Sequence, residues 1–163
     1  VKTSKRNYNT RTVLLAIGRR GTPRKLGVPG EEMSKVVYRV IDPAQHRNQH
    51  VLVVGGGDSA LEAATTIAEE PGTTVTLSYR SEAFSRAKPR NRQRVEDMAA
   101  TGRLRVLFSS NVKAIFEDRV QLEQDGSPEE IQNDAVVVSA GGILPSGFLK
   151  TIGIHVETKW GTE

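Results

Sequence analysis

Three small residues in one short segment have the spacing of a dinucleotide-binding turn. Gly55, Gly57 and Ala60 form a G-x-G-x-x-A pattern directly after the apolar run 51–54. In such a turn the first glycine permits a tight bend, the second lets backbone approach a pyrophosphate, and the small third residue allows close packing of helix on strand. The pyrophosphate then faces a helix N-terminus, where unpaired N–H groups and the helix dipole favour an anion. We therefore predict a dinucleotide site here; a structural β–α turn without a ligand is the alternative.

The residues after the next strand indicate which dinucleotide is bound. A second β-branched run, 74–79, follows one helix later, and an NAD-binding unit usually carries an acidic residue at this strand end. This chain has Tyr79-Arg80-Ser81 instead, and an arginine accommodates a 2′-phosphate. The sequence therefore favours NADP(H), with NAD(H) as the alternative. Arg86, in the basic segment that follows, is a candidate for closing over the adenosine phosphate, whereas a solvated loop is the alternative for that segment.

The elements that must position these residues form a βαβ unit. Residues 59–70 have apolar side chains spaced for one buried helix face, and Pro-Gly follows the helix. Residues 104–108 predict a third parallel strand. We expect an α/β protein with a Rossmann-like, three-layer dinucleotide-binding fold and a parallel sheet. We also expect a small antiparallel β-meander packed against that sheet, formed by 112–116, 120–123 and 135–138.

The flanking segments are predicted to lead into and out of this unit. An apolar strand is expected at 12–18, and 19–49 is interpreted as a linker with a strand-like fragment at 36–41. The tail at 153–158 alternates like an edge strand. The resulting division is 1–47, a partial strand and linker; 48–145, the dinucleotide-binding domain; and 146–163, a return segment.

Composition excludes several other classes of protein. The 163 residues are 37% hydrophobic and 26% charged, which is typical of one globular domain. The net charge is +4, but only 5% of residues are aromatic and they do not interleave with the basic ones, so we expect no nucleic-acid partner. With no cysteine and no histidines at ligand spacing, neither a disulfide nor a metal site is predicted. No apolar run suits a membrane span, and we expect a cytoplasmic protein.

No catalytic constellation is visible in the sequence. No histidine has a serine or carboxylate nearby in an arrangement that suggests nucleophilic catalysis. Asp58 and Glu62 lie one helical turn apart, and stabilisation of a helix N-terminus alone would explain acidic residues there.

Together these motifs resemble the pyridine-nucleotide domain of thioredoxin-reductase-like flavoproteins. The resemblance rests on Gly55-Gly56-Gly57-Asp58-Ser59-Ala60 with Glu62, on Tyr79-Arg80, and on the flanking Ala16-Ile17-Gly18, Val28-Pro29-Gly30-Glu31 and Ala140-Gly141-Gly142. In that family an NADPH domain interrupts an FAD domain. The resemblance implies that 16–18 and 140–142 are the crossing points between the two.

Two departures narrow the resemblance. Thioredoxin reductases carry a redox-active Cys-x-x-Cys shortly before the glycine turn, where this chain has Tyr38-Arg39-Val40-Ile41, so dithiol exchange by this domain is excluded. The chain is therefore similar to the cysteine-free relatives, the ferredoxin–NADP reductase-like and bacillithiol disulfide reductase-like proteins. It also has one glycine-rich turn and no FAD fingerprint, which suggests the central portion of a larger flavoprotein.

The resemblance implies a set of cofactor-binding residues. Those around the pyrophosphate would be Gly55, Gly57, Asp58, Ser59 and Ala60, and those around the 2′-phosphate Tyr79, Arg80, Ser81 and Arg86. Glu62, Ala140 and Gly141 complete the set.

The implied function is delivery of hydride from NADPH to FAD held by another domain of the parent chain, which passes electrons to an unidentified acceptor. A stand-alone NAD(P)H-binding sensor or interaction module without turnover is the alternative. Apolar residues of the connecting segments would leave exposed surface, so self-association as a homodimer is a further expectation.

Overall fold

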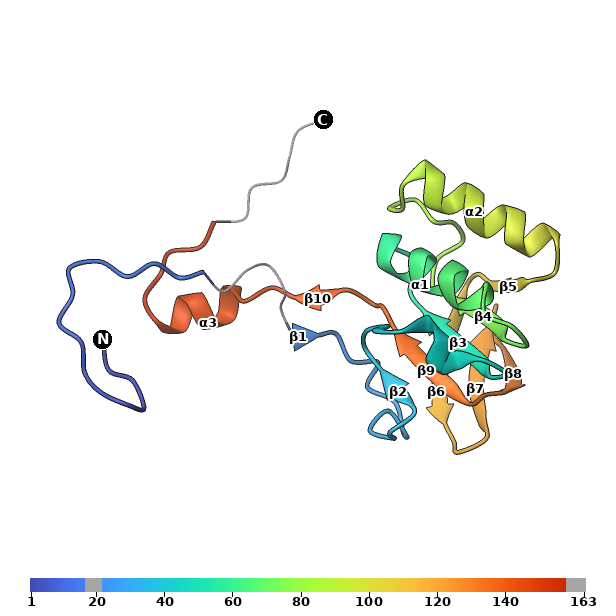
Figure 1. The fold of residues 1–163 in the computed structure, drawn as a ribbon, viewed down its shortest axis with the longest axis horizontal. Coiled ribbons are helices and arrows are strands. Elements are labelled where there is room, and N and C mark those ends of the chain that lie inside the picture. The colour runs from blue at the N-terminus through green and yellow to red at the C-terminus, as the bar shows by residue number, and fades with distance from the viewer. Residues whose placement is uncertain (17–21, 158–163) are drawn as a thin grey trace. The chain divides into compact units, whose positions relative to one another are not determined.

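A computed structural model describes residues 1–16 and 22–157 of the chain. Its internal contacts divide it into two units, one spanning Pro23–Ile143 and the other comprising Val1–Thr22 with Leu144–Glu163. The unit Pro23–Ile143 holds the parallel sheet, the glycine turn and both of the longer helices (Figure 1).

The centre of this unit is a five-stranded parallel sheet with the order β2-β9-β3-β4-β5. Val51 in β3 is paired with Val75 in β4 on one side and with Ala135 in β9 on the other. Long stretches of these central strands are buried on both faces, which explains their continuous apolar runs. The strands are β2 (Val36–Val37), β3 (His50–Val54), β4 (Thr74–Ser78), β5 (Leu104–Leu107) and β9 (Ala135–Val138).

Alternate residues of the central strands belong to two separate cores. Val51 and Val53 pack with α1 (Asp58–Ala68) and α2 (Pro89–Ala100), whereas Leu52 packs with the antiparallel strands. Figure 1 shows the two helices on one side of the parallel sheet and the antiparallel sheet on the other. The fold therefore has three layers, and the predicted Rossmann-like α/β class is confirmed.

The small antiparallel sheet is present, but its third strand was predicted wrongly. It consists of β6 (Ser110–Ile115), β7 (Arg119–Gln124) and β8 (Ser127–Gln132), in that order. Residues 135–138, which we expected in this meander, form β9 between β2 and β3 of the parallel sheet. All four of these residues are buried, as a strand covered on both faces requires.

The segment that takes the third position in the meander begins directly after a tight turn. Asp125 and Gly126 make the turn, with φ of 48° and 80°, and the new strand begins at once with Ser127 and Pro128. Proline is tolerated because β8 is an edge strand that pairs only with β7.

Other expectations for the flanking segments also need correction. Within 36–41 only Val36–Val37 is strand, and because it pairs with β9 this part of the expected linker belongs to the sheet. Next comes a 3-10 helix, η1 (Pro43–His46). Residues 12–16 are not strand, since none of the described residues pairs with them; Ile17 and Gly18 lie outside the described residues. Of the tail expected as an edge strand, residues 153–157 are not strand, and Thr158 lies outside the described residues.

Three short elements complete the described chain. The strands β1 (Thr22–Pro23) and β10 (Gly142–Ile143) form a two-stranded sheet. The six-residue helix α3 (Ser146–Thr151) lies in the segment that we expected to be a simple return segment.

A buried carboxylate organises the loop that precedes β2. Glu31 is 8% exposed, and its carboxylate accepts hydrogen bonds from the Leu26 and Gly27 backbone N–H groups at 2.6 and 2.7 Å and from the Tyr38 hydroxyl at 2.8 Å. Burial by itself raises the pKa of Glu31, but these hydrogen bonds to the ionised form outweigh burial and hold the pKa below its usual 4.5.

We predict that Glu31 makes the stability of the chain sensitive to acid. Because its pKa is lowered in the folded state, the ionised carboxylate stabilises the fold above the unfolded pKa, and this stabilisation is lost as pH falls through the folded pKa. Glu31→Gln should destabilise the protein near neutral pH by roughly 1–3 kcal/mol. It should also flatten the loss of stability between roughly pH 6 and pH 3 in urea titrations. Equal pH slopes for the two proteins would contradict the assignment.

Candidate functional site

The glycine turn joins the carboxyl end of β3 to the first turn of α1. Gly55 has φ of +144°, and its N–H donates to the Ser78 carbonyl at 3.0 Å. A Cβ at Gly55 would overlap the Ser139 carbonyl oxygen and would lie 3.0 Å from the Ala60 Cβ. Glycine at 55 and a small residue at 60 are therefore both required by packing, as the motif predicts.

The open part of the turn lies at Gly57, the N-cap of α1. A Cβ built on Gly57 meets no described atom within 4 Å. Among the described residues, none accepts a hydrogen bond from the backbone N–H of Gly57, Asp58 or Ser59. First-turn N–H groups of a helix have no intrahelical partner. The turn thus presents donors and the positive end of a helix dipole beside free space, the arrangement that suits a phosphate.

The middle glycine has a different role, which the sequence analysis missed. A Cβ on Gly56 would overlap the Tyr79 ring. Tyr79 in turn stacks on Phe84, with ring centroids 5.6 Å apart, and Phe84 contacts Phe108 at 4.8 Å. The sequence does hold a signal for this role: the dinucleotide pattern needs glycine only at 55 and 57, so the additional glycine at 56 indicates a separate packing requirement.

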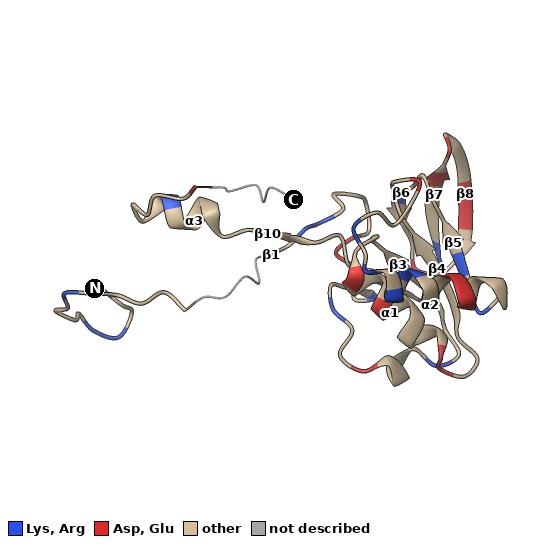
Figure 2. Cartoon of the chain, turned by 90° about the horizontal axis from the view of Figure 1, so that it is seen from above, with Lys and Arg blue, Asp and Glu red and all other residues tan. Residues whose placement is uncertain are grey.

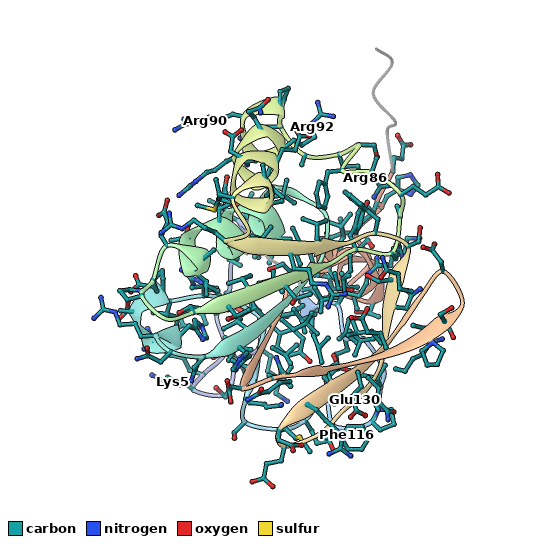
Figure 3. All side chains as sticks on the ribbon, turned by 90° about the vertical axis from the view of Figure 1, so that its right-hand side faces the viewer. Lys5, Arg86, Arg90, Arg92, Phe116 and Glu130 are labelled. Carbon is teal, nitrogen blue, oxygen red and sulfur yellow. The ribbon has the colours of Figure 1, made fainter. Side chains whose placement is uncertain are left out.

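The candidate 2′-phosphate residues follow β4 in the loop that leads to α2. Arg80, Ser81 and Arg86 are exposed, and neither arginine forms an ion pair with another described residue. The loop is held to the chain after β5, because Ser109 N–H donates to the Ser81 carbonyl at 3.2 Å and Ser110 N–H to the Tyr79 carbonyl at 3.0 Å. Figure 3 shows Arg86 in this loop and Arg90 and Arg92 on the helix α2 that follows it.

The two acidic candidates contact α2. Asp58 Oδ1 accepts hydrogen bonds from the Lys88 N–H and from Asn91 Nδ2, each at 2.8 Å. Glu62 Oε1 accepts from the same Asn91 side chain at 3.0 Å. The hydrogen bond from the Lys88 backbone, reinforced by Asn91, lowers the pKa of the Asp58 carboxyl below its ordinary value.

The remaining candidates follow β9. Ser139 N–H donates to the Val54 carbonyl at 2.8 Å, so the segment after β9 runs next to the end of β3. Ala140 packs on the core between the two sheets. Gly141 adopts φ of +85°, and its carbonyl accepts the Arg24 N–H at 3.0 Å. In open α/β sheets ligands bind beyond the carboxyl ends of the strands, which is where the structure brings these segments together.

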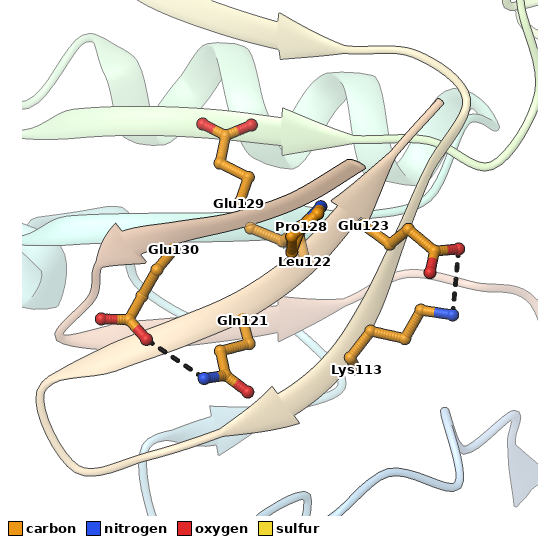
Figure 4. A pocket seen from close by; sticks show the side chains of 7 residues that line it. All are labelled: Lys113, Gln121, Leu122, Glu123, Pro128, Glu129 and Glu130. Carbon is orange, nitrogen blue, oxygen red and sulfur yellow. Dashed lines mark hydrogen bonds and ion pairs between the residues drawn. The ribbon is translucent and has the colours of Figure 1, made fainter. Parts of the chain in front are cut away.

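A surface hollow elsewhere in the unit lies apart from the glycine turn. It lies on the antiparallel sheet and is lined by Lys113, Gln121, Leu122, Glu123, Pro128, Glu129 and Glu130 (Figure 4). Its charged and amide side chains all have partners: Lys113 pairs with Glu123 at 3.1 Å, Gln121 with Glu130 at 3.2 Å, and Glu129 with Arg105, outside the hollow, at 2.7 Å. We interpret it as a solvated sheet face. Figure 2 shows that acidic and basic residues are likewise interspersed over the rest of this unit.

Within 1–16 and 22–157, no cluster of His, Cys, Asp or Glu could hold a metal ion. Among the helices that the structure describes, none has the length and apolar character needed to cross a membrane.

The parallel sheet, its covering helices and the glycine turn at the end of β3 define a Rossmann-type α/β protein. Comparison with known sequences narrows this class. The chain belongs to the pyridine nucleotide-disulphide oxidoreductase family, whose sequence profile matches residues 1–162.

Individual relatives agree with this assignment. A ferredoxin–NADP reductase from Ignicoccus hospitalis is 34% identical over 93% of this chain and 50% of its own length. The bacilliredoxin reductase Bdr from Bacillus subtilis is 30% identical over 99% of this chain and 50% of its own length. A solved bacillithiol disulfide reductase Bdr from Staphylococcus aureus matches with a TM-score of 0.81 and 29% identity, over 87% of this chain and 44% of that one. The chain thus spans about half the length of the curated relatives it matches.

We predict that the two neighbouring glycines differ in their tolerance of a side chain. Gly56→Ala must displace the Tyr79 ring and should destabilise the fold by about 1–3 kcal/mol. Gly57→Ala should change stability little, because its φ of −98° suits any residue and the space around it is open. Urea unfolding of both variants measures the difference; equal destabilisation would contradict the packing of Gly56 beneath Tyr79.

Proposed function

We propose that this chain supplies the NADP(H)-binding domain of an FAD-dependent pyridine-nucleotide oxidoreductase. The observation that carries the proposal is the presence of two features: a turn with open N–H donors, at Gly57 to Ser59, and a loop after β4 that exposes two arginines and is held by backbone hydrogen bonds. A pyrophosphate and a 2′-phosphate are the two anionic groups of NADP(H), and the two features match them one for one.

The roles of the residues follow from their chemistry. The N–H groups of the first turn of α1 would hold the pyrophosphate without a counter-cation, through fixed dipoles. Arg80, with Arg86, would form charge-assisted hydrogen bonds to the 2′-phosphate. Tyr79 and Ser81 would border the adenosine. Ala140 and Gly141, beside the end of β3, would border the cofactor on the side of β9.

The flavin would be held by a further domain of the parent protein. When bound, FAD accepts the hydride from the nicotinamide, and this chain's part is to bind and orient the dinucleotide. With no cysteine in the sequence, the chain itself has no thiol for a dithiol step. The acceptor of the electrons would be recognised mainly outside these residues.

Exposed apolar side chains near both ends of the sequence support this proposal. Leu14 is 90% exposed, Val13 59%, Leu144 58% and Phe148 53%. Burial of such large apolar side chains against another protein surface would be favourable. We propose that a flavin-binding domain covers them in the parent protein.

We predict that Arg80 carries the preference for NADP(H) over NAD(H). Loss of one charge-assisted contact in Arg80→Ala should weaken NADP⁺ about tenfold to hundredfold and leave NAD⁺ nearly unchanged. Calorimetric titration with both cofactors measures the ratio. Arg103→Ala, an exposed arginine after α2, is the matched control and should bind like wild type.

A companion variant in the same titration tests the glycine turn. Gly57→Val fills the open space and should abolish binding of both cofactors, with unchanged far-ultraviolet circular dichroism. If Arg80→Ala leaves the ratio of the two affinities unmoved, the 2′-phosphate assignment is wrong. Retained binding by Gly57→Val would place any ligand elsewhere.

We also predict that residues 1–163 bind NADPH without oxidising it. Because the sequence has a single dinucleotide fingerprint, the purified chain should be colourless after gel filtration in the presence of FAD. NADPH absorbance should stay constant with a generic electron acceptor. Stoichiometric flavin retained together with steady NADPH consumption would show a complete enzyme and refute the domain assignment.

A further inference from the structure

The carboxylate of Asp58 connects the glycine turn to a segment far along the chain. Helix α2 begins with Pro89, and its N-cap residue, Lys88, has no side chain that caps the helix. Asp58, the first residue of α1, accepts the backbone N–H of Lys88 at 2.8 Å. The N-terminus of α2 is therefore joined to α1, and the hydrogen bond satisfies one of the four N–H groups at the start of a helix that have no intrahelical partner.

Asn91 provides a second contact between α1 and the start of α2. Asn91 donates its side-chain amide both to Asp58 Oδ1, at 2.8 Å, and to Glu62 Oε1, at 3.0 Å. Further along the two helices, Arg94 pairs with Glu69 at 2.6 Å. The first turn of α2 is thus held by the first two turns of α1.

The loop between β4 and α2 is consequently fixed along its length. At its start, Tyr79 and Ser81 are hydrogen-bonded to residues that follow β5. In its middle, Phe84 is 6% exposed and packs between Tyr79 and Phe108. At its end, Lys88 is held by Asp58. The arginines of this loop are therefore presented by a preformed backbone.

We propose that Asp58 is a positioning residue for the 2′-phosphate end of the cofactor site, and thereby a determinant of NADP(H) specificity. This inference rests on the proposed function. It explains why an acidic residue follows a turn suited to a pyrophosphate, where a carboxylate facing the anion would repel it. The carboxylate is instead engaged by donors of the neighbouring segment.

A positioning role and a purely electrostatic role predict opposite changes in NADP⁺ affinity when Asp58 is removed. If Asp58 acted only through its charge, its removal would strengthen binding of every anionic ligand nearby. If it fixes the loop, its removal leaves the Lys88 N–H without its acceptor and Asn91 with Glu62 alone, and ordering the loop must then accompany binding of the 2′-phosphate. NAD⁺ lacks that phosphate and depends less on the loop, so the ratio of the two affinities must fall.

The test is calorimetric titration of four variants with NADP⁺ and NAD⁺. Asp58→Ala and Asn91→Ala should each weaken NADP⁺ by about fivefold to twentyfold, with changes of at most about twofold for NAD⁺. Asp58→Asn should keep most of the NADP⁺ affinity, because its amide oxygen still accepts both hydrogen bonds. Glu96→Ala, an exposed acidic residue on α2, is the charge-matched control and should behave as wild type.

The outcomes separate this inference from the function on which it rests. Wild type that binds neither cofactor refutes the proposed function. Wild type that binds, with Asp58→Ala and Asn91→Ala weakening both cofactors equally or strengthening both, refutes only the positioning role. Thermal unfolding reports whether each variant folds. If Asp58→Ala does not fold, Asn91→Ala decides the question, because it removes the two hydrogen bonds from the Asn91 side chain to α1 without altering the glycine turn.

Discussion

Burial of β3 on both of its faces is the constraint on which the rest of the unit depends. Val51 and Val53 pack under the helices and Leu52 under the antiparallel sheet, each at most 2% exposed. A strand covered in this way has no freedom to slip, since a shift by one residue would exchange its two cores. The glycine turn at its end is consequently fixed relative to both neighbouring strands, and the open donors of α1 have a defined location.

Sequence patterns predicted the elements whose signals are local. Each of these elements is indicated by residues within it or directly beside it. Examples are the apolar run of β3, the Pro-Gly after α1, the β-branched run of β4 and the motif Gly55, Gly57 and Ala60. The assignment of 135–138 to the meander was wrong because a run of four apolar residues predicts a strand but does not indicate which strand it pairs with. Their place in the parallel sheet depends on pairing with residues about eighty positions earlier, as in the contact of Val51 with Ala135.

The candidate site was predictable to a similar extent. The positions of Gly55 and Ala60 follow from a turn whose geometry is the same wherever it occurs. Gly56, Phe84 and Asn91 were missed because their roles exist only between elements: a glycine beneath a ring, a ring between two others, and an amide shared by two carboxylates. Apart from the extra glycine in the turn, no residue-type pattern along the chain indicates these contacts, and only the fold brings the residues together.

The position of β9 has a consequence for synthesis of the chain. Its neighbours β2 and β3 both precede it, and the hydrogen bond between Asp134 and the His50 N–H joins residues 84 positions apart. Until residues 135–138 leave the ribosome, β2 has no strand to pair with and one edge of β3 keeps its backbone groups unpaired. Such an apolar edge is a template for pairing with other chains. Closure of the sheet is thus a late, non-local step, and the nascent chain is exposed to aggregation until it occurs.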